Sequence, residues 1–156
     1  MAYYQVIGYN WNHWANREVS RVTKSNINHV SIRVSPFCGD SQPHELYVSH
    51  RTTDTWVPSR VVERINGPPV WKGRMVTMKC HAELEFIKMW AQWWKDTEPG
   101  NLIKPYLYHY FGRRFGLEAP WTCTRLCATI LDNFGIQIKE RFYPNLFIQE
   151  YIKETY

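Results

Sequence analysis

Cys123 stands at the start of an apolar, helix-periodic run in the stretch APWTCTRLCATIL, residues 119–131. A thiol in the first turn of a helix lies near unpaired backbone N–H groups and the positive end of the helix dipole, which favour the thiolate. The same N–H groups are suited to hold the oxyanion of a tetrahedral intermediate. The position therefore predicts a nucleophile if a base lies nearby, and otherwise a small buried apolar residue.

His29 is the best candidate for that base. It begins the stretch HVSIRV, 29–34, in which aliphatic residues alternate with polar ones, so its ring belongs to the face opposite the aliphatic layer. In the next predicted strand, HELYVSH, Leu46 belongs to the core face and Glu45 to the face of His29. Glu45 is thus preferred over His44 as the third group that would orient the imidazole, although the sequence leaves the choice open.

Hydrophobic periodicity, together with the glycine, proline and capping residues that end helices and strands, predicts the elements that must position these residues. The N-terminal half predicts strands over 2–9, 29–34 and 44–50, a helix over 14–23, and a short strand with an irregular segment within 51–67. The C-terminal half predicts a strand through Val76 and Met78, a buried helix over 82–95, a short helix or loop over 105–116, a helix from Thr122 to Asn133 ended by Gly135, and a helix starting at Pro144.

This order predicts a single α+β domain over residues 1–156, with an antiparallel sheet packed against helices, one of which bears Cys123. The chain shows no repeat, linker or low-complexity tract. At 156 residues with 44% apolar and 16% aromatic residues, it is long enough for one hydrophobic core.

The net charge of +5 is modest and the basic residues are scattered, so nucleic-acid binding is not expected. No signal-like N-terminus and no apolar run of about 18 residues are present, which predicts a cytoplasmic protein without a membrane span. The four cysteines, 38, 80, 123 and 127, are expected to be free thiols, and Cys127 to be buried and inert. No metal site is expected, because Cys123 and Cys127 have no accompanying Cys-x-x-Cys or His-Glu-x-x-His pattern.

An ordered set of short motifs resembles a known family. The set runs from TKSNINHVSI, which contains His29, through Glu45 and the triplet KPY, 104–106, to WTCTRL, 121–126, and the closing PNL, 144–146. In this order it resembles the circularly permuted papain-like hydrolases related to the NlpC/P60 superfamily, in which histidine precedes cysteine. The resemblance extends over nearly the whole chain and implies a permuted papain-like fold.

The resemblance implies a cysteine hydrolase that cleaves an amide bond in a peptide or cell-wall peptide and needs no cofactor. Cys123 would be the nucleophile, His29 the general base and later acid, and Glu45 the orienting group. The residues placed beside the substrate are Tyr106, Trp121 and Thr124. The family commonly has Cys-Ser-Glu where this chain has Cys-Thr-Arg, and an Asp where it has Leu107, which leaves the substrate open.

Two alternatives remain at this point. One is a catalytically inactive papain-like scaffold that binds a partner or builds a structure, for example as a virion component, since small aromatic-rich chains are common in phages. The other is an acyltransferase that uses the same three residues on lipid or thioester donors. The sequence does not predict the oligomeric state.

Overall fold

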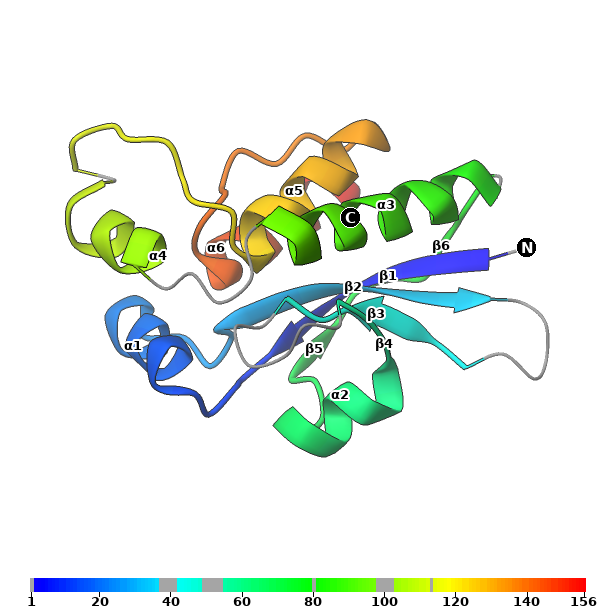
Figure 1. The fold of residues 1–156 in the computed structure, drawn as a ribbon, viewed down its shortest axis with the longest axis horizontal. Helices are drawn as coiled ribbons and strands as arrows, with labels where there is room; N and C mark the ends of the chain where they lie inside the picture. Colours follow the sequence, from blue (N-terminus) through cyan, green and yellow to red (C-terminus); the bar gives the residue numbers. More distant parts are fainter. Residues whose placement is uncertain (1, 37–41, 49–54, 80, 98–102, 113) are drawn as a thin grey trace.

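The strand β1 (Ala2–Tyr9) runs through an open antiparallel sheet in the computed structural model, which describes residues 2–36, 42–48, 55–79, 81–97, 103–112 and 114–156. The strand order is β4-β3-β2-β1-β5, and β6 also pairs with β1 (Figure 1). The other strands are β2 (His29–Pro36), β3 (His44–Leu46), β4 (Trp56–Pro58), β5 (Trp71–Lys72) and β6 (Val76–Thr77). Of the predicted features, Cys38, His50 and Cys80 lie outside the described residues.

The helices divide between the two faces of this sheet. Figure 1 shows α3, α5 and α6 on one side and α2 on the other, with α1 at one end. Their bounds are α1 (Trp14–Thr23), α2 (Ser59–Asn66), α3 (His81–Thr97), α4 (Ile103–Leu107), the π-helix η1 (Tyr108–Gly112), α5 (Cys123–Asn133) and α6 (Pro144–Thr155). None of these helices is long and apolar enough to span a membrane, as far as the chain is described. The α+β class predicted from the sequence is confirmed.

The main core lies between the sheet and the α3, α5 and α6 layer. The aliphatic residues of β2, Val30, Ile32 and Val34, are at most 1% exposed and pack in one cluster with buried residues of α5 such as Leu126. A smaller cluster on the opposite face contains Ile7, Tyr9, Trp11, Tyr47 and Val62. The strict alternation of 29–34 is thus used as predicted, with its aliphatic side toward the helices.

Several predicted elements match the structure closely. The helix over 14–23 has these bounds, the helices predicted over 82–95 and from Thr122 are α3 and α5, and the helix at Pro144 is α6. Gly135 follows α5 with a φ of 86°, in the left-handed region where glycine is favoured.

Two expectations were wrong in detail. Within 51–67, residues 51–54 lie outside the described residues, and the segment predicted to be irregular contains the helix α2, whose apolar residues Val61, Val62 and Ile65 stand at helical spacing. Of the strand predicted over 44–50, β3 comprises His44–Leu46, and residues 49–50 lie outside the described residues. Tyr47 and Val48 follow β3 and stay buried, and the Tyr47 N–H donates to the Thr55 carbonyl at 2.8 Å.

Candidate functional site

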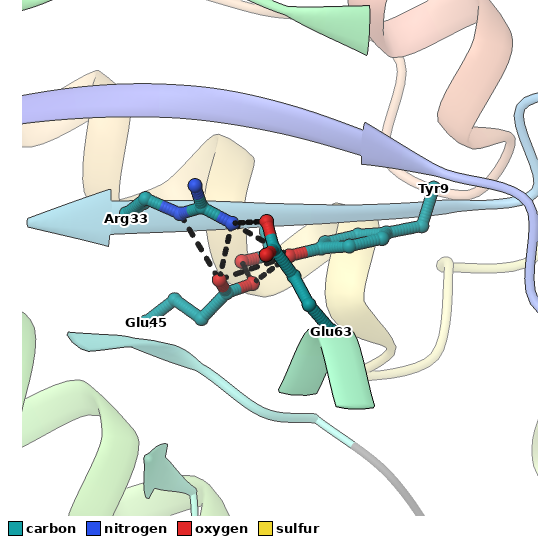
Figure 2. Close-up of polar contacts among 5 residues, drawn as sticks. Tyr9, Arg33, Glu45 and Glu63 are labelled. Atoms are coloured by element: carbon teal, nitrogen blue, oxygen red, sulfur yellow. Dashed lines mark hydrogen bonds and ion pairs between the residues drawn. The ribbon is translucent and has the colours of Figure 1, made fainter. Parts of the chain in front are cut away.

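Glu45 lies in a buried polar network between the sheet and α2 (Figure 2). It is fully buried, and its carboxylate accepts hydrogen bonds from the Tyr9 hydroxyl at 2.7 Å and from the Ser31 hydroxyl at 2.8 Å. Arg33 forms an ion pair with Glu45 at 3.0 Å and a second one with Glu63 of α2 at 2.9 Å. The carboxylate that was predicted to orient His29 is therefore hydrogen-bonded to three other side chains instead.

Charge explains why these partners hold the carboxylate. A buried carboxylate is costly unless it is paired and hydrogen-bonded, and a guanidinium with several donors meets that need better than a neutral imidazole. Burial, followed by the nearby Glu45, raises the pKa of Tyr9, so its hydroxyl stays protonated and donates. The network joins β1, β2, β3 and α2, which is a structural role.

His29 lies on the same face as this network, next to Trp11. The two rings are stacked, with centroids 3.4 Å apart and planes 14° apart, and His29 is only 2% exposed. Burial lowers its pKa to about 3, so the ring is neutral near pH 7. Its Nε2 atom has no hydrogen-bond partner among the described residues. The ring is thus held by stacking rather than by a carboxylate.

Cys123 is the first residue of α5, after Thr122 in an extended conformation, and is partly exposed. Burial raises the pKa of its thiol, although hydrogen bonds from the backbone of Val30 and from Thr124 act in the opposite direction. The sequence position predicted a lowered pKa from the helix end, whereas burial has the larger effect here. The group is a thiol near neutral pH.

The sheet separates the helix of Cys123 from the layer of His29 and Glu45. Cys127, one turn further along α5, places its sulfur 3.9 Å from the carbonyl oxygen of Val30, on the aliphatic face. His29 and Glu45 share the opposite face, as their parity predicted. Within the described part of the chain, no hydrogen bond joins any two of Cys123, His29 and Glu45. Cys127 itself is fully buried, as expected.

The three residues predicted beside the substrate lie in different surroundings. Thr124 is fully buried. Trp121 packs against Trp93 at 4.7 Å between ring centroids, and the Arg125 guanidinium lies 4.0 Å over its ring. Tyr106 is 52% exposed and lines a pocket between α4 and α1.

That pocket lies between α1 and the α4–η1 segment and has a volume of about 420 Å³, within the range of small-molecule sites. Aromatic side chains form most of its wall, and Glu18 of α1 contributes the carboxylate. Its lining residues are Trp14, Ala15, Glu18, Val19, Pro105, Tyr106, His109, Tyr110 and Phe142. The π-helix η1 supplies two of them, and such π-helical turns often occur at functional sites.

Glu18 joins the two sides of the pocket. It accepts a hydrogen bond of 2.9 Å from the Tyr110 hydroxyl and forms an ion pair with Arg21 one turn along α1. These hydrogen bonds, first that from Arg21 and then that from Tyr110, lower the pKa of Glu18 to about 2. The carboxylate is therefore ionised throughout the neutral range.

His109 completes the polar side of the pocket. Its Nδ1 atom lies 3.1 Å from the Tyr143 hydroxyl, and its Nε2 atom lies 4.0 Å from Glu18. Burial lowers the pKa of His109, against the opposing effect of Glu18. No group of three metal-binding side chains occurs in the residues that the structure describes.

The sequence contained weak signals for this pocket. Trp14 and Glu18 lie one turn apart on α1, but Tyr110 stands 92 positions after Glu18, and no local pattern predicts that these two segments pack together. The aromatic density of PYLYHYFG, 105–112, was the one visible sign that this segment lines something. Comparison of the chain with protein-family models, with curated proteins and with solved structures finds no match.

Proposed function

We propose that this protein is a non-catalytic binding protein, and that the pocket between α1 and the α4–η1 segment is its ligand site. The single observation that carries the proposal is the composition of this pocket, in which aromatic walls surround an ionised carboxylate. A well-formed apolar pocket with a few convergent polar groups is the usual form of a small-molecule site.

The scaffold proposed is the permuted papain-like one, and the order of His29, Glu45 and Cys123 supports it. Binding is favoured over hydrolysis because a hydrolase of this type needs a thiol, an imidazole and an orienting group in one hydrogen-bonded chain. Here Glu45 is paired with Arg33, and His29 is stacked on Trp11. A protein that kept the scaffold and lost turnover fits these contacts.

The ligand proposed is a small organic cation. Aromatic faces attract cations, and quaternary ammonium groups are recognised by cages of aromatic side chains. Trp14, Tyr106 and Tyr110 offer such faces and are each about half-exposed, while Glu18 supplies the negative charge. Arg21 neutralises part of that charge, so the aromatic walls must contribute much of the affinity.

The test uses three probes with a common benzyl or phenyl body and different charges: benzyltrimethylammonium, benzyl alcohol and benzoate. Titration by calorimetry or by NMR shifts is expected to show binding of the cation about tenfold tighter than the alcohol, and weakest binding of benzoate. A Glu18→Gln variant is expected to remove the preference for the cation. The matched control is Glu85→Gln, since Glu85 also pairs with a basic residue three positions on, Lys88, on the exposed surface of α3.

The outcomes test two claims separately: that the pocket binds a ligand, and that this ligand is a cation. If none of the three probes binds, the pocket is not a ligand site and the proposal fails. If the alcohol binds as tightly as the cation, the pocket stands and the cationic ligand is wrong. If the Glu85→Gln control also lost binding, the change seen in Glu18→Gln would result from general destabilisation of the fold.

A second candidate is a cysteine hydrolase or acyltransferase that uses Cys123. The observation that favours it is the position of Cys123 in the first turn of α5, with a hydrogen bond from the backbone of Val30, the neighbour of His29. A peptide amide, a lipid ester or a thioester would each be a suitable acyl donor. Mass spectrometry after incubation with such donors tests it, since acylation at Cys123 would identify the class.

A further inference from the structure

Exposed apolar side chains gather in one segment of the chain, next to the pocket but largely outside it. Between residues 103 and 117, six large hydrophobic residues are each at least 45% exposed. These are Tyr106, Leu107, Tyr110, Phe111, Phe115 and Leu117. Phe115, at 68%, is the most exposed large hydrophobic residue in the described part of the chain. Concentrations of this kind mark interaction sites, whereas isolated exposed residues need no explanation.

Backbone hydrogen bonds make this segment a compact turn. The N–H of Phe115 donates to the carbonyl of Phe111 at 3.2 Å, and the N–H of Leu117 donates to that of Gly112 at 2.8 Å. Gly116 has a φ of 69°, which allows the chain to reverse there. Figure 1 shows the chain between α4 and α5 running out beyond the end of the sheet and back. The exposed rings are therefore carried on a projecting part of the molecule.

Basic side chains outnumber acidic ones in and beside this segment, although Glu118, which follows Leu117, is also exposed. Lys104 and Arg114 are exposed, Arg113 adds a third basic residue in the sequence, and residues 103–117 contain no aspartate or glutamate. Segments that lie in the interface of a bilayer combine aromatic and leucine side chains with lysine and arginine, and this segment has that composition. The basic residues match the negative surface of anionic lipids.

We propose that the surface formed by Lys104, Phe111, Arg114, Phe115 and Leu117 attaches this protein peripherally to anionic lipid bilayers. The rings of Phe111 and Phe115 insert at the level of the headgroups, and the two basic side chains lie against lipid phosphates. A protein partner would also cover exposed apolar residues, but the excess of basic over acidic side chains around them favours an anionic lipid surface. The described helices offer no span, so this attachment is interfacial.

The membrane surface and the ligand pocket can be tested independently. Phe111 and Phe115 do not line the pocket, whereas Tyr106 and Tyr110 do. Substitution of the two phenylalanines therefore leaves the walls of the pocket in place. The matched control is Ile65 of α2, which is 59% exposed and lies on the helix that covers the opposite face of the sheet.

The experiment is flotation of the full chain with vesicles of phosphatidylcholine, alone or mixed with phosphatidylglycerol. The expected result is flotation with the anionic vesicles, which decreases with added salt. The double variant Phe111→Ser/Phe115→Ser is expected to lose this binding, while Ile65→Ser retains it. The double variant Lys104→Gln/Arg114→Gln is expected to bind roughly thirtyfold more weakly to anionic vesicles, because two basic residues near the surface are removed.

Several results would overturn the proposal. Absence of flotation for the unchanged protein would do so, as would equal flotation of the double phenylalanine variant. Size-exclusion chromatography tests whether the surface instead binds a second copy of the chain. If the unchanged protein is a dimer and the double phenylalanine variant is a monomer, the surface is an interface between copies. Benzyltrimethylammonium binding should be unaffected by these substitutions, so failure here leaves the ligand pocket standing.

Discussion

The imidazole of His29 lies flat against the indole of Trp11, with 3.4 Å between ring centroids, on the sheet face opposite the one that α5 covers. This stacking keeps the ring out of solvent and neutral. The Glu45 carboxylate accepts its hydrogen bonds from Tyr9, Ser31 and Arg33 and not from His29.

The buried His29 makes stability depend on pH. Its folded pKa of about 3 lies below the usual 6.5, so the unfolded chain binds a proton that the folded chain does not. The contribution is therefore fully present above about pH 6.5 and is lost as the pH falls toward 3, with a slope near 1.4 kcal/mol per pH unit. The variant His29→Phe keeps an aromatic ring on Trp11 and cannot titrate. Urea unfolding of both proteins from pH 7 to pH 4 should show the extra slope in the unchanged protein alone; parallel curves would contradict the burial of His29.

Loss of the Glu45 charge should destabilise the fold. Among the described residues, Glu45→Gln leaves the buried Arg33 with Glu63, which is partly exposed, as its one ionic partner. Removing one member of a buried ion pair commonly costs 3–5 kcal/mol, and we expect about 3 kcal/mol because the second partner remains. Urea unfolding measures this loss. Glu63→Gln is the control and should cost distinctly less; equal costs would show that the buried carboxylate has no special role.

Arg21 should oppose ligand binding in the pocket. It pairs with Glu18 from outside the pocket and is itself largely exposed, so its removal frees the carboxylate for a cationic ligand. Arg21→Gln is thus expected to bind benzyltrimethylammonium about threefold to tenfold more tightly. Calorimetric titration with benzyltrimethylammonium measures this change. Weaker binding in this variant would mean that the ion pair is needed to hold Glu18 in place, which would contradict the proposed competition.

The sequence was sufficient for the elements whose pattern is long and regular. The alternation of 29–34 and the apolar spacing after Thr122 are both strong, and the structure uses them as β2 and α5. Parity along the strands also placed Glu45 and His29 on one face. What parity cannot decide is which polar residue of that face takes the carboxylate. Arg33 does so, because a guanidinium compensates a buried negative charge and a neutral imidazole does not.

The pocket lay beyond the reach of local patterns. Glu18 and Tyr110 stand 92 positions apart and meet only because the α4–η1 segment packs against α1. The π-helix that aims His109 and Tyr110 has no distinctive sequence signature here. The lowered pKa expected for Cys123 failed for a related reason, since burial depends on tertiary packing rather than on position in a helix.

The reactivity of the Cys123 thiol tests the central claim, that this chain binds without hydrolysing, most directly. Iodoacetamide labelling is followed by peptide mass spectrometry across pH 6 to 10 in the unchanged protein and in His29→Phe. The account predicts slow labelling at neutral pH, an increase only as the pH approaches the raised pKa of the thiol, and equal rates in the two proteins. Rapid, selective labelling of Cys123 at pH 7 that disappears in His29→Phe would contradict it and establish the hydrolase candidate instead.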